Sequence, residues 1–186
     1  MERLLSPRRQ RGAALLIVIA LFLILLPLAL MAIFQRSLQN DQFAQSAQWR
    51  AQSRDAANQA MAALRSTIAQ TIGTSGLLEY QPSPPSWFVT PSAQLQPTSS
   101  QFWQSCAANR LCQSTTVTLQ NGTGRQTFNV LQLATPTGVI DPTLCGQQGY
   151  VAVFYNLWVQ ATASANPAAG SATEQAVYRA CVKTGA

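Results

Sequence analysis

The residues with the clearest chemistry in this chain are four cysteines, Cys106, Cys112, Cys145 and Cys181. All four follow a long apolar segment, and an even number of cysteines in that position is typical of an oxidising compartment. The chain has no histidine and no C-x-x-C pair, so we expect no metal site. We therefore expect these residues to form disulfides.

Four cysteines allow three pairings, and the sequence alone does not choose among them. We favour Cys106 with Cys112 and Cys145 with Cys181. In the chain-entropy model these two loops contribute about 2.4 and about 3.8 kcal/mol to stability. The second disulfide would fix the last strand of the chain.

No catalytic group is evident elsewhere in the sequence. There is no histidine and no glycine-rich phosphate loop, and the five acidic residues beyond residue 12 are far apart in sequence. General acid–base catalysis depends mostly on histidine and paired carboxylates. We therefore expect no enzymatic activity and no cofactor.

The charge is concentrated at the N-terminus. The formal net charge is +6, and the first twelve residues hold four arginines against Glu2, so half of this excess lies there. Beyond them, basic residues are sparse and scattered, whereas a nucleic-acid surface needs them on one face. Only 10% of all residues are charged, against about 25% in an ordinary soluble domain. We expect neither nucleic-acid binding nor a cytosolic globule.

The elements that position these groups begin with an apolar segment. Residues 13–34 are 22 consecutive uncharged residues, of which 15 are Leu, Ile, Val or Phe. As a helix they span about 33 Å, enough to cross a bilayer core of about 30 Å. Their summed insertion energy favours the membrane by up to roughly 4 to 9 kcal/mol, and Pro27 does not overturn this.

The flanks of this segment predict its orientation. Arginines precede it, while only Arg36 and Asp41 follow closely, so the N-terminus is expected in the cytoplasm and the C-terminal part in the periplasm. A cleaved secretory signal has a shorter apolar region and a small-x-small site, which residues 27–34 lack. A twin-arginine signal at Arg8 and Arg9 is a further alternative. We favour a retained helix.

The stretch from Arg9 to Val18, RQRGAALLIV, resembles a class III prepilin leader. The resemblance implies that a prepilin peptidase cuts between Gly12 and Ala13, and that Ala13 is then N-methylated. Cutting before the apolar segment leaves the helix attached, so that it serves as membrane anchor and filament core. The alternative interpretation of the same stretch is an ordinary signal anchor with a basic flank.

The fifth position of the implied mature chain carries Ile17, where major pilins have a glutamate. In the family that carboxylate is thought to pair with the terminal amine of a neighbouring subunit. Minor pilins of the PilX type and the K-type pseudopilin of type II secretion also lack the acid, and they lie in a complex thought to prime the filament and cap its tip. The resemblance therefore implies a minor pilin of a type IV pilus.

This resemblance implies the partners and the location of the chain. The partners would be the prepilin peptidase, other minor pilins, the major pilin, the inner-membrane assembly platform and membrane lipid. The chain would first lie in the inner membrane and then in the pilus at the cell surface. The K-type pseudopilin is the less favoured member of the family, because it carries a large added domain for which this chain has no length.

The helix is expected to continue over residues 35–72, where proline and glycine are absent and Ala, Gln and Arg abound. Within it, four apolar residues spaced three, four and four positions apart form a stripe on one helix face, which would pack on the distal domain. Gly73 and Gly76 would end the helix. The stripe consists of Met61, Leu64, Ile68 and Ile72.

Residues 77–105 hold five prolines and are expected to form a variable loop rather than regular structure. Four Trp and Phe residues lie in it, and we expect them to anchor the loop onto the domain, with ligand or partner binding as the alternative. They are Trp87, Phe88, Phe102 and Trp103.

The strand signals come last in the chain. Residues 115–119 and 127–133 flank Asn121-Gly122, which is a hairpin-turn signal and, with Thr123, also a glycosylation sequon. Residues 150–163 alternate as a half-buried strand, and residues 174–183 return beside it. We thus predict an α+β fold in which a long N-terminal transmembrane helix packs on a disulfide-linked antiparallel sheet of about four strands. The expected organisation is a leader (1–12), a transmembrane helix (13–34), its periplasmic continuation (35–72) and a distal domain (73–186).

Two functions outside filament assembly remain open from the sequence. The first is a signal-anchored periplasmic module whose loop 77–105 binds a ligand, which predicts no cleavage at Gly12. The second is DNA uptake, which would share the processing and would need a basic surface, with salt-dependent binding as its signature. That surface would have to come from Arg110, Arg125, Arg179 and Lys183.

Overall fold

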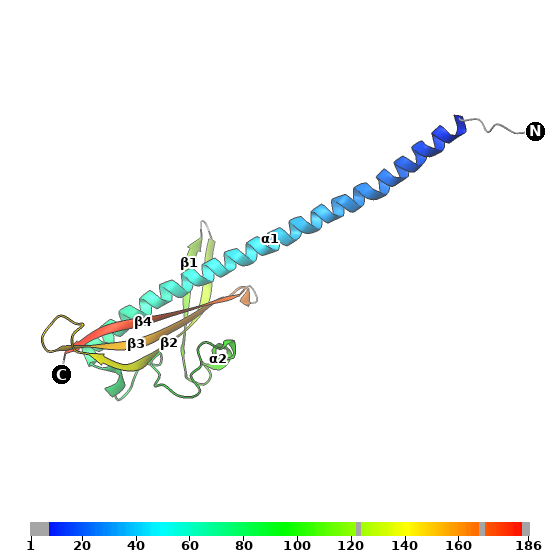
Figure 1. The fold of residues 1–186 in the computed structure, drawn as a ribbon. Coiled ribbons are helices and arrows are strands. Elements are labelled where there is room, and N and C mark those ends of the chain that lie inside the picture. Colours follow the sequence, from blue (N-terminus) through cyan, green and yellow to red (C-terminus); the bar gives the residue numbers. More distant parts are fainter. Residues whose placement is uncertain (1–7, 122–123, 168–169, 184–186) are drawn as a thin grey trace, which may run out of the picture. The chain divides into compact units, whose positions relative to one another are not determined.

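A computed structural model describes residues 8–121, 124–167 and 170–183 of the 186-residue chain (Figure 1). The chain divides into two compact units, Met1–Gln45 and Ser46–Ala186. The elements are helix α1 (Arg8–Ser75), the 3-10 helix η1 (Leu78–Tyr80), helix α2 (Ser100–Ser105) and strands β1 (Gln113–Asn121), β2 (Gly124–Asp141), β3 (Tyr150–Ala163) and β4 (Ser171–Lys183). The predicted long helix and antiparallel sheet are both present, in agreement with an α+β fold.

The part of α1 that belongs to the second unit buries one face against the sheet. The predicted stripe of Met61, Leu64, Ile68 and Ile72 is buried in the main core, as expected from its spacing. One turn earlier, three alanines continue the same buried face. These are Ala56, Ala57 and Ala60.

The helix ends later than the sequence predicted. Gly73 is helical, and α1 continues to Ser75. Gly76 then takes a positive φ of 75°, and its N–H donates to the carbonyl of Ile72 at 3.0 Å. This left-handed residue after the last helical turn satisfies a carbonyl that would otherwise be free, so Gly76 is the terminating glycine.

The four strands form one antiparallel sheet in the order β1-β2-β3-β4. The main core lies between α1 and one face of this sheet. On β3 the alternate residues Val153, Tyr155, Leu157 and Val159 are buried on that face, which confirms the predicted parity and the strand bounds. β1 and β2 pair as far as Asn121 and Gly124, and the predicted turn residues Gly122 and Thr123 lie outside the described residues.

β2 is longer than predicted because it passes through a bulge. Its register with β3 shifts between Pro136 and Ile140, and Gly138 within the bulge has a φ of 73°. Sequence rules end a strand at such proline and glycine residues. Here the strand continues to Asp141 because the bulge absorbs them.

The segment between α1 and the sheet, predicted as a loop, contains η1 and α2 and is attached to both sides of the sheet. Trp87 and Phe88 are buried in the main core, and Phe88 forms an isolated bridge with Ala134 of β2. Phe102 and Trp103 of α2 are buried in a second cluster, with Leu133, on the opposite sheet face. All four Trp and Phe residues therefore anchor the segment, as predicted.

Candidate functional site in the apolar segment

The apolar segment of α1 exposes all of its described large side chains. Sixteen of them lie between Leu15 and Phe34, and each is at least 46% exposed. Burial of apolar surface is the main source of stability in water, so a surface of this kind needs an apolar environment. α1 is long and apolar enough to cross a membrane.

The residues implied to carry processing lie within this helix. α1 begins at Arg8 and includes both Gly12 and Ala13. Ile17 lies one turn beyond Ala13 on α1 and is 61% exposed. A carboxylate at this position would lie among apolar neighbours, where a charge is costly unless paired.

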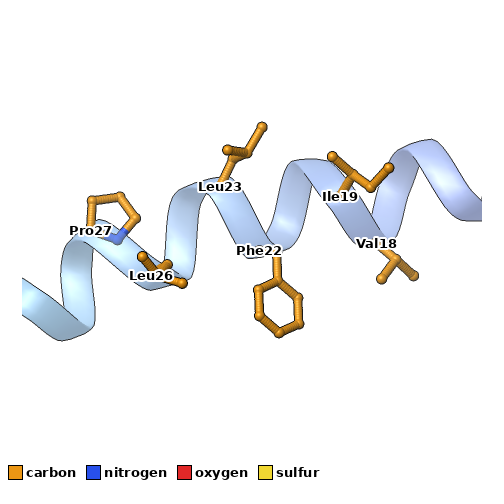
Figure 2. A pocket seen from close by; sticks show the side chains of 6 residues that line it. All are labelled: Val18, Ile19, Phe22, Leu23, Leu26 and Pro27. Atoms are coloured by element: carbon orange, nitrogen blue, oxygen red, sulfur yellow. The ribbon is translucent and has the colours of Figure 1, made fainter.

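Pro27 interrupts the hydrogen bonding of this segment without ending the helix. It has no N–H, so the carbonyl of Leu23 does not receive the bond that residue 27 would normally donate. A shallow apolar groove of about 270 Å³ lies here between Val18 and Pro27. Figure 2 shows Leu23 and Pro27 on the same side of the helix. In lipid, a carbonyl without its helical bond is best accommodated beside another helix or a water molecule.

The four cysteines lie in the second unit and form two disulfides. Cys106 pairs with Cys112, and Cys145 pairs with Cys181, so the structure contains both favoured pairings. The first closes the turn after α2 within the second cluster. The second links the loop after β2 to the end of β4, which holds the C-terminal strand at the sheet edge.

Polar contacts connect α1 with the end of the sheet near the β3–β4 connection. The buried hydroxyl of Ser53 donates to the carbonyl of Gly170 at 3.5 Å. One residue later, Arg54 forms an ion pair with Glu174 of β4, with Nε and Oε1 3.4 Å apart. The arginine of this ion pair is exposed, so the pair adds little stability, and apolar packing is the main contact between the helix and the sheet.

One titratable group is buried in the main core. The Tyr155 hydroxyl donates a 3.1 Å hydrogen bond to Oε2 of Glu79, which is exposed on η1. Burial raises the pKa of Tyr155, and the negative charge of Glu79 raises it further. The hydroxyl is thus held protonated, as a structural donor. Sequence reasoning did not anticipate this pair, because no short-range signal connects residues 76 positions apart.

The described residues contain no group of three His, Cys, Asp or Glu side chains that could hold a metal ion. No protein-family model, curated protein or solved structure matches the chain. The function is therefore inferred from the residues themselves. The implied processing residues lie in the first unit and the disulfides in the second, so the structure does not bring these two sets together.

Proposed function

We propose that this chain is a minor pilin that takes part in assembling a type IV pilus, where it primes the filament and lies at or near the tip. The observation that carries the proposal is the placement of an exposed apolar helix directly after a basic stretch that ends in Gly12. In this proposal the chain begins in the inner membrane with its N-terminus in the cytoplasm. A prepilin peptidase then releases residues 1–12.

The exposed apolar helix supports the proposal because lipid and neighbouring filament helices offer the same kind of environment. A helix with apolar residues on all sides is stable in a bilayer, and it remains stable when it moves into a bundle of similar helices. The Leu15–Phe34 surface has this character throughout its described side chains. The major pilin and other minor pilins are the partners that would cover it.

The continuity of α1 supports retention of the segment. Signal peptidase requires a small-x-small site after the apolar region, and residues 27–40 are helical without such a site. The same helix continues to the buried stripe that holds the sheet. A cut at Gly12, in contrast, would leave the anchor and the sheet domain on one chain.

Ile17 supports a position at the tip rather than in the body of the filament. A repeating subunit would use an acid here to neutralise the amine of its neighbour, and Ile17 offers no charge. A subunit at the tip has no subunit above it that needs this pair. The absence of the acid thus suits a subunit present in few copies.

A pseudopilin of type II secretion is the second candidate, and the segment between α1 and β1 disfavours it. Pseudopilins of the K type carry a large added domain. In this chain the described residues 76–112 contain only η1 and α2, and their Trp and Phe residues attach the segment to the sheet. The pilus is therefore preferred.

Filament formation in a strain that lacks this chain tests the proposal. We expect few or no surface filaments by electron microscopy, restoration by the wild-type chain, and no restoration by Gly12→Glu, which blocks the cut. Gln10→Ala, a leader change away from the cut, is the matched control and should restore filaments. Normal filament number in the deletion strain, with the chain absent from sheared filaments, would contradict the proposal.

A further inference from the structure

A polar pocket of about 460 Å³ lies beside α2, and the proposed function does not use it. Its volume is within the range of about 300 to 1,000 Å³ found for small-ligand sites. Six of its lining residues carry uncharged hydrogen-bonding side chains, namely Gln94, Gln96, Ser99, Gln101, Ser105 and Asn109. Phe102 and Leu111 complete the lining, so the pocket combines many neutral polar groups with a small apolar surface.

The six polar side chains of this pocket are free to bind a ligand. Within the described residues, none of them donates or accepts a side-chain hydrogen bond, although the backbones of several do. Ser99 is half-buried and the others are exposed. Each amide offers two donors and an acceptor, and each hydroxyl offers both functions.

The base of the pocket is held by several independent contacts. Trp103 is buried and donates from Nε1 to the carbonyl of Pro97 at 2.8 Å. The Cys106–Cys112 disulfide closes the following turn, and the Leu111 N–H donates to the carbonyl of Cys106 at 2.8 Å. A site whose frame is fixed before binding loses less conformational entropy when it binds.

The chemistry of the lining selects the class of ligand. No charged residue lines the pocket, so an anion or a cation would gain no ionic partner to offset its loss of water. A ligand rich in hydroxyl groups can pair with many amides and hydroxyls at once, and its C–H surface can lie against Leu111, which is only half-buried. Neutral sugars have both properties.

We propose that this polar pocket binds an uncharged carbohydrate. Gln101 and Asn109 would supply hydrogen bonds to sugar hydroxyls, and the half-buried Leu111 would supply a small apolar surface. This inference does not depend on the pilin assignment, since the pocket is in the second unit and the leader is in the first.

The test uses the full-length protein in lipid nanodiscs, which avoids sugar-based detergents. Maltotriose, cellotriose and triacetylchitotriose are the neutral probes, 3′-sialyllactose is the anionic probe, and binding is measured by saturation-transfer NMR and calorimetry. We expect at least one neutral probe to bind. Gln101→Ala and Asn109→Ala should each weaken that binding by roughly three- to ten-fold, as expected for loss of one or two neutral hydrogen bonds.

The matched control is Gln104→Ala, because Gln104 is exposed on the same helix but does not line the pocket. This variant should bind the sugar as the wild type does. Failure of all three neutral probes to bind would overturn the proposal. So would equal binding by the pocket variants, or tighter binding of 3′-sialyllactose than of any neutral probe.

Discussion

The Tyr155 hydroxyl, in the middle of β3, donates a 3.1 Å hydrogen bond to the carboxylate of Glu79 on η1. The Tyr155 ring is fully buried and contacts Phe88 edge to face, with ring centroids 6.2 Å apart. The Tyr155 side chain therefore connects the sheet to η1 and to Phe88, both of which lie in the segment that follows α1. This contact links η1 to β3, in addition to the burial of Leu78 in the main core.

Removing the Tyr155 hydroxyl should destabilise the second unit moderately. Tyr155→Phe keeps the ring and loses the bond to Glu79, and we expect a loss of about 1 kcal/mol, because the carboxylate partner remains in contact with water. The measurement is thermal unfolding of the full-length protein in nanodiscs. Tyr80→Phe, next to Glu79 and 83% exposed, is the control and should change stability by less than about 0.5 kcal/mol. Equal effects of the two variants would contradict a role for this bond.

Alkaline pH should destabilise the fold partly through the same residue. The pKa of Tyr155 is raised in the folded state, so its hydroxyl stays protonated there, whereas in the unfolded chain it ionises near its ordinary pKa of about 10. The stability contribution is fully present below about pH 10 and is lost as the pH rises toward the folded pKa. Melting temperatures from pH 8 to 11.5 should fall less steeply for Tyr155→Phe than for the wild type. Parallel curves would show that Tyr155 titrates alike in both states.

The two disulfides should differ in their resistance to reduction. Cys106 and Cys112 are buried, whereas Cys181 is exposed and Cys145 half-buried, and thiol–disulfide exchange requires access to a sulfur. Under native conditions a mild reductant should open Cys145–Cys181 first, with a loss of up to about 3.8 kcal/mol of stability. Differential alkylation followed by mass spectrometry identifies the opened pair. Reduction of Cys106–Cys112 first would contradict the assigned burial.

A stabilising substitution is expected in the turn after α2. Arg110 has a φ of 57°. Its N–H donates to the carbonyl of Ala107, and the N–H of Leu111 donates to the carbonyl of Cys106. A helix end that is terminated by glycine has the same two bonds. Arg110→Gly removes the strain of a side chain in this conformation and should stabilise the fold by about 1 kcal/mol. Ala107→Gly in the same turn has no such strain to relieve and should destabilise it. Chemical denaturation of the full-length protein compares the two.

Local patterns in the sequence predicted the elements that depend on residues close together in the chain. The alternation on β3 and the 3-4-4 stripe on α1 were both confirmed, because a buried strand face or helix face imposes its own period. The choice between Gly73 and Gly76 as helix end was not predictable in this way. It depends on backbone geometry at Gly76, and either glycine satisfies the local rule.

Contacts between distant residues account for what was missed. β2 can continue past Pro136 because of the side on which the Pro136 nitrogen lies. The N–H of Ala134 donates to the carbonyl of Trp87 and its carbonyl accepts from the N–H of Val89, so both groups of Ala134 face away from β3. Backbone groups two residues apart in a strand face the same side, so the nitrogen of Pro136 also faces away from β3. Its missing N–H therefore removes no bond to β3. Likewise, α2, which contributes residues to the pocket, is held on β2 by the burial of Phe102 and Trp103 with Leu133.

Processing of the chain as a prepilin can be read from the mass of its N-terminal peptide. The protein would be extracted from membranes of cells with and without the prepilin peptidase. We expect an N-methylated Ala13 that is present only when the peptidase is present. An intact Met1, or a cut beyond Phe34 in both strains, would contradict it.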